Sequence, residues 1–288
     1  MHRDMKRRLF VGLAGLLAAV AVGAVPVAVA ARGHVPSNPK RGVGSTWYMW
    51  FGPQALTRVG ASWAYDWSTK LPKAVRGIEW VPMVWGARSV SPRVIRTLSS
   101  YARTGRARYL LTFNEPDQRS QANMTPAQAA ALWPALEKTG LKLGSPAPAI
   151  WFGKWFQQFM ALARARHLRV DFIALHFYQD FTAPGAVALL RSHLLAVWNR
   201  YHRPIWVTEI GTADTRAWGK PMRYTPTTAR SLRYMRQVLA MLDSLPFVKR
   251  YAWFTDRCWH ERGCQVSSLF SDGRGHETSL GKLYATTP

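Results

Sequence analysis

From residue 40 onward, short hydrophobic runs alternate with longer segments in which hydrophobic residues recur every three or four positions. The short runs are rich in β-branched and aromatic residues, which favour strands. Several are hydrophobic on both faces, for example Tyr109-Leu110-Leu111-Thr112-Phe113, as expected of strands buried in a parallel sheet. The predicted strands are Arg41–Tyr48, Ala61–Asp66, Glu79–Trp85, Tyr109–Asn114, Leu141–Ser145, Val170–His176, Ile205–Glu209 and Arg250–Phe254.

The longer segments carry signals for helix starts. Ser91-Pro92 opens one amphipathic segment. Thr125-Pro126-Ala127-Gln128 combines an N-cap residue, a proline at the first helical position and a glutamine at the capping-box position. Further helices are predicted over Lys154–Arg166, Ala186–Tyr201 and Thr228–Asp243.

This strand–helix alternation predicts an α/β fold, a (β/α)₈ TIM barrel in a single domain. The alternative is a doubly wound open sheet, but neither G-x-G-x-x-G nor G-x-x-x-x-G-K-[ST] occurs in the chain. There is no internal repeat, low-complexity tract or interdomain linker. We therefore predict a single catalytic domain over residues 41–288, preceded by a short linker over residues 31–40.

The N-terminus has the layout of a secretory signal peptide over residues 1–30. Basic residues dominate the first eight positions, and an uncharged hydrophobic run follows from Leu9 to Ala30. That run ends in Ala28-Val29-Ala30, the small-x-small pattern of a cleavage site. The pattern predicts a secreted protein. The alternative is a retained membrane anchor at residues 9–30 with the domain facing outside, because the run is long enough to span a bilayer.

Export changes the interpretation of the two cysteines. Cys258 and Cys264 lie in one predicted loop, and outside the cytoplasm they can form a disulfide. Two free thiols are the alternative.

Two glutamates stand where strands end. Glu115 follows the fourth predicted strand in Phe113-Asn114-Glu115-Pro116-Asp117, and Glu209 ends the seventh. Barrel enzymes carry their chemistry at the carboxyl ends of strands. Two carboxylates at the carboxyl end of a barrel, here called its mouth, are the minimum set for glycoside hydrolysis. One acts as the acid and the other as nucleophile or base. The alternative is structural: acids at strand ends also form ion pairs with arginines.

Aromatic residues near the same strand ends favour a sugar substrate. Sugar rings pack their C–H faces on aromatic faces, and their hydroxyls bind polar side chains. Most tryptophans in a chain nevertheless pack in the core. The residues next to strand ends are Tyr65, Trp67, Trp85, Tyr178 and Trp253, with Asn114, His176 and Asp66 as polar partners.

Taken together, the motifs resemble those of glycoside hydrolase family 128, a family of secreted β-1,3-glucanases in the retaining barrel clan. The resemblance spans residues 40–284. It rests on Ser62-Trp63-Ala64-Tyr65-Asp66-Trp67-Ser68, Trp80-Val81-Pro82-Met83-Val84-Trp85-Gly86, Phe113-Asn114-Glu115-Pro116-Asp117, Gln121-Ala122-Asn123-Met124-Thr125-Pro126, Leu143-Gly144-Ser145-Pro146-Ala147, Asp171-Phe172-Ile173-Ala174-Leu175-His176-Phe177-Tyr178, Ile205-Trp206-Val207-Thr208-Glu209 and Arg250-Tyr251-Ala252-Trp253-Phe254.

The resemblance implies roles for some of these residues. Glu115 is expected to be the acid/base and Glu209 the nucleophile of a retaining endo-β-1,3-glucanase. Asn114 is expected to bind the sugar 2-hydroxyl. The resemblance also implies His176 and Tyr178 as substrate contacts and Trp85 and Trp253 as stacking platforms. Tyr65 and Asp66 are expected contacts because of their place next to a strand end.

Composition and charge exclude several other classes. Of 288 residues 48% are hydrophobic, which excludes intrinsic disorder. No H-E-x-x-H or similar ligand spacing occurs, so we expect no metal and no cofactor. A non-catalytic carbohydrate-binding protein on the same barrel is the main rival, as is a hydrolase of another β-linked polysaccharide.

The chain is strongly basic, with 39 Lys and Arg against 15 Asp and Glu and a net charge of +24. Without residues 1–30 the net charge is +21. The basic residues are spread over predicted helices and form no recognised binding module, so we expect no nucleic-acid partner. We expect a monomer that acts on a β-glucan and is attracted electrostatically to an anionic cell envelope.

Overall fold

The computed structural model describes residues 38–46, 52–73, 76–150, 152–258 and 263–287. The predicted signal peptide and most of the predicted linker lie outside these residues. Val35–Pro288 form one compact unit. Among the described residues, no helix has the length and hydrophobicity needed to cross a membrane.

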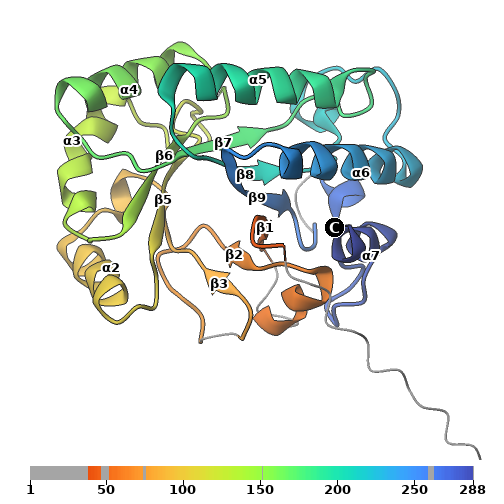
Figure 1. Ribbon diagram of the computed structural model, residues 1–288, viewed down its shortest axis with the longest axis horizontal. Coiled ribbons are helices and arrows are strands. Elements are labelled where there is room, and N and C mark those ends of the chain that lie inside the picture. The colour runs from red at the N-terminus through yellow and green to blue at the C-terminus, as the bar shows by residue number, and fades with distance from the viewer. Residues whose placement is uncertain (1–37, 47–51, 74–75, 151, 259–262, 288) are drawn as a thin grey trace, which may run out of the picture. The chain divides into compact units, whose positions relative to one another are not determined.

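The described residues form nine parallel strands in a closed ring (Figure 1). β1 pairs with both β2 and β9, which closes the ring, and an isolated parallel bridge between Gly144 and Phe172 joins the two hydrogen-bonded sheets. The strands are β1 (Arg41–Gly44), β2 (Trp63–Tyr65), β3 (Glu79–Trp80), β4 (Met83–Val84), β5 (Tyr109–Asn114), β6 (Lys142–Ala147), β7 (Ile173–Phe177), β8 (Ile205–Ile210) and β9 (Val248–Phe254).

The predicted barrel is confirmed, with the third strand in two pieces. β3 pairs with β2, and β4 pairs with β5. Pro82 lies between them and has no N–H to donate to a ladder, so the hydrogen-bonded strand is interrupted there. Together β3 and β4 fill one of eight positions around the ring.

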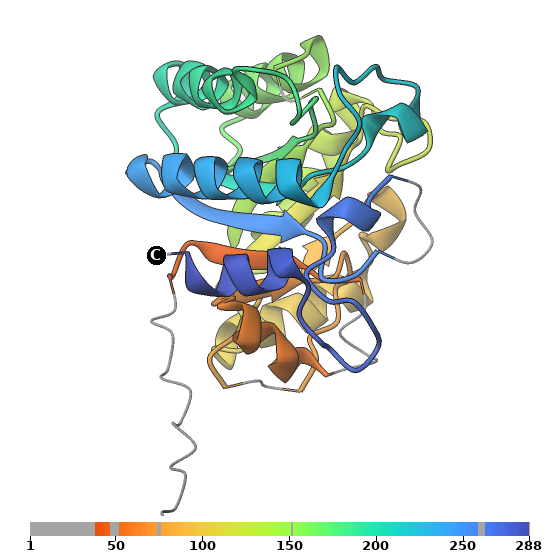
Figure 2. The same ribbon diagram turned by 90° about the vertical axis from the view of Figure 1, so that its right-hand side faces the viewer.

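Helices cover the outside of the barrel strands (Figures 1 and 2). They are α2 (Pro92–Arg103), α3 (Pro126–Glu137), α4 (Lys154–Ala165), α5 (Ala186–Tyr201), α6 (Thr228–Ser244) and α7 (Ser279–Thr286). The predicted starts are confirmed: Ser91 accepts a hydrogen bond from the N–H of Val94, and Thr125 and Gln128 form a reciprocal capping box. The described part of the first connection holds only a 3₁₀ helix, η1 (Pro53–Val59), and that of the second holds no helix.

Hydrophobic residues alternate between the barrel interior and two outer layers. Trp63, Met83, Leu111, Phe172 and Trp206 belong to the interior cluster. The strand residues beside them point outward, where one layer packs against α2, α3 and α4 and the other against α5, α6 and α7. A barrel of this kind has a packed interior and presents its carboxyl-end loops for function.

Candidate active site

The predicted site residues meet at the carboxyl end of the barrel. Glu115 directly follows β5, His176 lies on β7, and Glu209 lies on β8. The β8 ladder is irregular between Val207 and Ile210, where its register shifts against β9. Val207 packs in an outer layer, and simple alternation would turn Glu209 the same way. The irregularity directs the Glu209 side chain into the mouth instead, as bulges next to active sites often do.

Glu115, His176 and Glu209 form a connected row. The Nδ1 atom of His176 lies 3.1 Å from Oε1 of Glu115, within hydrogen-bond distance. Its Nε2 atom lies 3.4 Å from Oε1 of Glu209, an ion-pair distance without hydrogen-bond geometry. One oxygen of each carboxylate and one nitrogen of the imidazole all lie within 4.8 Å of one another. The two carboxylates therefore face each other with His176 beside them.

Three aromatic side chains donate hydrogen bonds to Glu209. The indole N–H of Trp67 donates to Oε1 at 2.9 Å, and the hydroxyl of Tyr178 donates to Oε2 at 2.9 Å. The hydroxyl of Tyr65 shares its proton between Oε1 at 3.2 Å and the carbonyl oxygen of Thr208 at 2.9 Å. Hydrogen bonds of this kind favour the ionised carboxylate and fix its orientation.

Burial and charge shift the pKa values of these groups. Burial raises the pKa of Glu209 and the charge of Glu115 adds to it, while His176 and the bonds from Trp67 and Tyr178 oppose the rise. Burial and the Glu209 carboxylate also raise the pKa values of Tyr65 and Tyr178 well above the ordinary value. Both phenols therefore keep the protons that they donate to Glu209.

His176 is enclosed between the two acids. Only 2% of the residue is exposed. Burial alone would lower the pKa of His176, but the charges of Glu209 and Glu115 and the hydrogen bond with Glu115 raise it above its usual value. The imidazole can thus hold a proton close to both carboxylates.

The backbone around Glu115 is fixed by neighbouring strands. The N–H of Asn114 donates to the carbonyl of Trp85, and the N–H of Glu115 donates to the carbonyl of Ala147. Glu115 has φ of 40°, in the left-handed region that side chains other than glycine rarely adopt. Such backbone conformations concentrate at functional sites, where the surrounding structure holds them in place.

A cavity of about 850 Å³ opens above the carboxylates. Aromatic and amide side chains dominate its wall, which suits a ligand with flat hydrophobic faces and many hydroxyls. Its lining residues are Thr46, Trp67, Trp85, Asn114, Glu115, Gln118, Ser120, Gln121, Ala149, Ile150, Tyr178, Glu209, Trp218, Lys220 and Phe254.

Asn114 presents an unused polar atom at this cavity. Its Nδ2 donates to Oε1 of Gln121 at 3.1 Å, whereas its buried Oδ1 has no hydrogen-bond partner within the described part of the chain. A buried amide oxygen without a partner is costly. A ligand hydroxyl in the cavity would satisfy it.

Four of the predicted contact residues do not line the cavity: Trp253, Asp66, His176 and Tyr65. Trp253 is completely buried in an outer layer and donates its indole N–H to the carbonyl of Ser267, so its prediction as a stacking platform is wrong. Phe254, the next residue, lines the cavity instead. Asp66 accepts from the N–H and hydroxyl of Ser68 in the turn after β2 and does not line the cavity.

Sequence reasoning missed several residues of the wall. Trp67 was noted beside a strand end but not as a donor to Glu209. Trp218 and Lys220 follow β8 in the 3₁₀ turn η3 (Thr215–Trp218) and just beyond it. The resemblance to a family gave no signal for them, because none of its motifs lies within residues 210–249.

The cluster of Glu115, His176 and Glu209 also has the spacing of a metal site. Glycoside hydrolysis by paired carboxylates needs no metal. Both oxygens of Glu209 already accept hydrogen bonds from the three aromatic donors. This arrangement stabilises Glu209 as an anion through hydrogen bonds.

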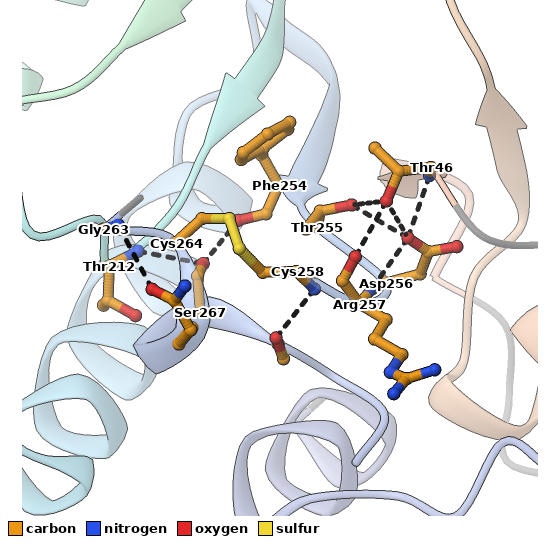
Figure 3. Close-up of a disulfide and its surroundings, with 12 residues drawn as sticks. Thr46, Thr212, Phe254, Thr255, Asp256, Arg257, Cys258, Gly263, Cys264 and Ser267 are labelled. Carbon is orange, nitrogen blue, oxygen red and sulfur yellow. Dashed lines mark hydrogen bonds between the residues drawn. A yellow bond between two sulfur atoms is a disulfide. The ribbon is translucent and has the colours of Figure 1, made fainter. Parts of the chain in front are cut away.

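Cys258 and Cys264 form a disulfide beside the mouth, with Cα atoms 5.6 Å apart (Figure 3). It lies in the segment after β9, next to Phe254 of the cavity wall.

A parallel barrel with facing carboxylates at its carboxyl end is typical of glycoside hydrolases, and residues 50–284 match the family of the glycosyl hydrolase catalytic core. A comparison with curated protein sequences finds no match. The protein is therefore a glycoside hydrolase on the evidence of its fold, its site and this family.

Solved structures define the family more closely. One is a subgroup I endo-β-1,3-glucanase of family 128 from Amycolatopsis mediterranei in complex with laminaritriose. It is 36% identical, covers 87% of this chain and 100% of its own, and has a TM-score of 0.74. A subgroup II endo-β-1,3-glucanase from Sorangium cellulosum is 30% identical, covers 86% of this chain and 98% of its own, and has a TM-score of 0.71. A subgroup III curdlan-specific exo-β-1,3-glucanase from Blastomyces gilchristii is also 30% identical. It covers 87% of this chain and 99% of its own, and has a TM-score of 0.66. The chain belongs to glycoside hydrolase family 128.

Proposed function

We propose that the protein is a retaining endo-β-1,3-glucanase with Glu115 as acid/base and Glu209 as nucleophile. The observation that carries this proposal is the separation of the two carboxylates, whose nearest oxygens lie within 4.8 Å. Retaining glycosidases hold their carboxyl groups about 5–5.5 Å apart, whereas inverting enzymes need about 6.5–9.5 Å to admit a water.

The surroundings of the two acids support different roles. Glu209 is 6% exposed, and its three aromatic donors stabilise the anion that must attack the sugar. Glu115 has a more exposed side chain and makes its one described side-chain contact with His176. A carboxyl group that lines the cavity in this way can pass a proton to the leaving oxygen and later take one from water.

The reaction then has two steps. Glu115 protonates the glycosidic oxygen while a Glu209 oxygen attacks C1, so that the C1–oxygen bond to the leaving chain breaks and a glycosyl ester forms. Glu115, now ionised, removes a proton from a water that attacks C1 and releases Glu209. The configuration at C1 is inverted twice and is therefore retained.

His176 acts on both acids. In contact with Glu115 and Glu209, it holds their carboxylates in place and its positive charge favours the ionised form of Glu209. It does not line the cavity, so we propose a positioning role in place of the predicted contact with substrate.

The cavity wall supports a glucan as the substrate. Trp85 and Phe254 offer aromatic surface, and Asn114 offers a buried amide oxygen that needs a hydroxyl partner. The β-1,3 linkage comes from the relatives, whose structures include complexes with laminaritriose, laminaripentaose and laminarihexaose. Endo action is proposed because the relatives at 36% identity are endo-acting.

The proposal includes where the protein acts and what it associates with. We infer that residues 1–30 direct export, and that the exported protein is a monomer. Helices α2, α4 and α5 contain no acidic residue, so their outer faces are basic. Such a surface would hold the enzyme near an anionic envelope, and retention should fall steeply as salt is added while hydrolysis of soluble glucan changes little.

Release of reducing ends tests the function. The protein without residues 1–30 is incubated with β-1,3-, β-1,4- and mixed-linkage glucans, beside Glu115→Gln and Glu209→Gln. We expect hydrolysis of the β-1,3-glucan with a mixture of product lengths, and its loss in both variants. Inactivity on every glycan with binding intact would identify a carbohydrate-binding protein instead, and undiminished hydrolysis by either variant would reject the assigned pair.

A further inference from the structure

We propose that Trp218 and Lys220 form a glucan-binding subsite beside the nucleophile, and that the Cys258–Cys264 disulfide holds this subsite in position. The inference rests on the proposed glucanase function and extends it to residues outside the quoted motifs. It concerns the connection between β8 and α6, which no catalytic residue occupies.

Trp218 and Lys220 present an aromatic ring and a cation to the cavity. Trp218 is 39% exposed, and its ring meets that of Tyr178 edge-on at 5.4 Å. Gly219 has φ of 73° and ends η3, which brings Lys220 to the same wall. An exposed ring provides a face for a sugar, and an ammonium group donates to its hydroxyls. Because Tyr178 also donates to Glu209, the subsite lies next to the reacting sugar.

The connection that carries these residues has little regular structure, and its far end is tied to the segment after β7, where the N–H of Arg223 donates to Asp180 and the N–H of Tyr224 donates to the hydroxyl of Thr182. Apart from η3 it has no regular structure before α6, and Arg216–Lys220 are exposed. Its base is held by residues after β9. The N–H of Asp214 donates to the carbonyl of Gly263 at 2.6 Å, the hydroxyl of Thr212 donates to the carbonyl of Val266 at 2.8 Å, and the N–H of Thr212 donates to the hydroxyl of Ser267 at 3.1 Å.

The disulfide fixes these residues to the barrel (Figure 3). Cys258 lies four residues beyond the end of β9 and donates its N–H to the hydroxyl of Ser268. Its bond to Cys264 therefore ties Gly263 and Val266 to the end of that strand. The packing is close, because a methyl group on Gly263 would lie 2.4 Å from the carbonyl oxygen of Asp214 and 3.1 Å from Cβ of Ala217.

The hydrogen bonds and ion pairs described for Glu115 and Glu209 do not involve the disulfide or the residues that it braces. Glu209 is held by Tyr65, Trp67, Tyr178 and His176, and Glu115 by the ends of β4 and β6. Opening the disulfide should therefore weaken binding of the glucan chain and leave bond cleavage intact.

The test separates binding from chemistry. We compare wild type with the Cys258→Ser/Cys264→Ser double variant, and with wild type treated with a dithiol, which gives two electrons and two protons to the disulfide and becomes oxidised itself. KM and kcat are measured on β-1,3-linked glucose oligomers of increasing length and on a short aryl β-glucoside. We expect KM for the long oligomers to rise about tenfold, the effect of losing one stacked ring, while kcat changes less than about twofold.

Three further variants sharpen the result. Trp218→Ala should reproduce the rise in KM, and adding the cysteine substitutions to it should then cost less than about twofold. Gly263→Ala keeps both cysteines but pushes against Asp214, so it should also raise KM for long oligomers. Tyr224→Ala is the matched control, because Tyr224 lies in the same connection and is 42% exposed but does not line the cavity.

The outcomes are distinct from those of the functional test. If wild type hydrolyses β-1,3-glucan but the cysteine variant has unchanged KM, the inference is wrong and the glucanase function stands. An equal loss on short and long substrates, or full additivity with Trp218→Ala, also overturns it. If the cysteine variant does not fold, Gly263→Ala and Trp218→Ala decide by the same measurements.

Discussion

The two ends of the barrel each hold a charged side chain among aromatic residues, but in opposite ways. At the carboxyl end, Glu209 accepts hydrogen bonds from the polar edges of Trp67, Tyr178 and Tyr65. At the amino end, the guanidinium of Arg250 lies over the faces of Trp63, Tyr109 and Trp206, at 5.4, 4.7 and 4.4 Å from the ring centroids. Aromatic rings are negative on the face and positive at the edge, so each arrangement matches the charge that it surrounds.

The difference shows how one barrel separates chemistry from stability. Glu209 borders a cavity of about 850 Å³ beside a second carboxylate, and the pair can exchange protons with a ligand. Arg250 instead pairs with Glu79 in the amino end, and its side chain is 12% exposed. We expect changes at the carboxyl end to affect activity and changes at the amino end to affect folding.

The largest effect should come from removing each carboxylate. Glu115→Gly and Glu209→Gly should each lower kcat/KM on unactivated glucan by about 10³-fold or more, because a nucleophile or a proton donor is lost. With an aryl glucoside, added azide should restore turnover in both. In Glu209→Gly, azide takes the place of the nucleophile and should yield the α-glycosyl azide.

The products distinguish the two roles. Glu115→Gly still forms the glycosyl ester, so azide attacks from the opposite face and should give the β-glycosyl azide. Identical anomers from both variants would contradict the assignment of acid/base and nucleophile. Unchanged melting temperatures are the control for folding.

The amino end should respond in stability. Arg250→Ala removes the less exposed of the two arginines that contact Glu79, together with its contacts on three aromatic faces, and a hydrogen bond to a charged group of this kind contributes about 1.5–3 kcal/mol. We expect chemical denaturation to show this loss of unfolding free energy, with kcat at permissive temperature unchanged.

Arg108→Ala is the matched control for that pair. Arg108 also contacts Glu79, at 3.3 Å, but its side chain is 71% exposed. Its removal should lower the free energy of unfolding by about 0–1 kcal/mol. Equal losses for the two arginines would show that burial on the aromatic faces contributes nothing.

His176→Gln should change the pH dependence of activity. Glu209 must be ionised to attack, burial raises its pKa, and the positive charge of His176 opposes that rise. Removing the charge raises the pKa of Glu209 further, so the acid limb of the kcat/KM profile should move to higher pH. We also expect kcat to fall by about 10- to 100-fold from misplaced carboxylates.

His193→Gln is the control, because this histidine of α5 has a pKa lowered by burial alone and does not contact either carboxylate. A shift of the acid limb to lower pH in His176→Gln would contradict the proposed charge on the imidazole.

The smallest effects should come from removing one indole N–H at each end of the barrel. Trp67→Phe removes a hydrogen bond to the Glu209 carboxylate and should lower kcat/KM by about tenfold. Trp63→Phe removes a bond to the carbonyl of Lys40 and should leave kcat unchanged while lowering stability by about 1–3 kcal/mol. Loss of activity in Trp63→Phe alone would break the proposed division between the ends.

Much of the barrel could be predicted from sequence because its strands are hydrophobic on both faces and its helices carry caps. β5 and α5 match their predicted bounds, and the capping box at Thr125 forms as expected. Proline at position 82 divides the third strand, an effect of a missing N–H that the hydrophobic pattern does not show.

The site residues that could be predicted are those whose chemistry identifies them. The residues that were missed depend on the direction in which a side chain points from its strand. Glu115 and Glu209 stand out because carboxylates are rare in this chain. Trp253 and Phe254 are adjacent aromatics on β9, and consecutive strand residues face opposite ways, so sequence alone did not tell which one lines the cavity. Trp218 could not be predicted because its position depends on contacts between segments distant in sequence.

The most direct test of the facing carboxylates is the anomer that the enzyme first releases. Proton NMR during hydrolysis of a β-1,3-glucan oligomer by wild type distinguishes the α- and β-anomers of the new reducing end before they interconvert. A separation within 4.8 Å between carboxylate oxygens predicts that the β-anomer appears first and the α-anomer later by mutarotation. Initial release of the α-anomer would contradict the retaining pair and the role of Glu209 as nucleophile.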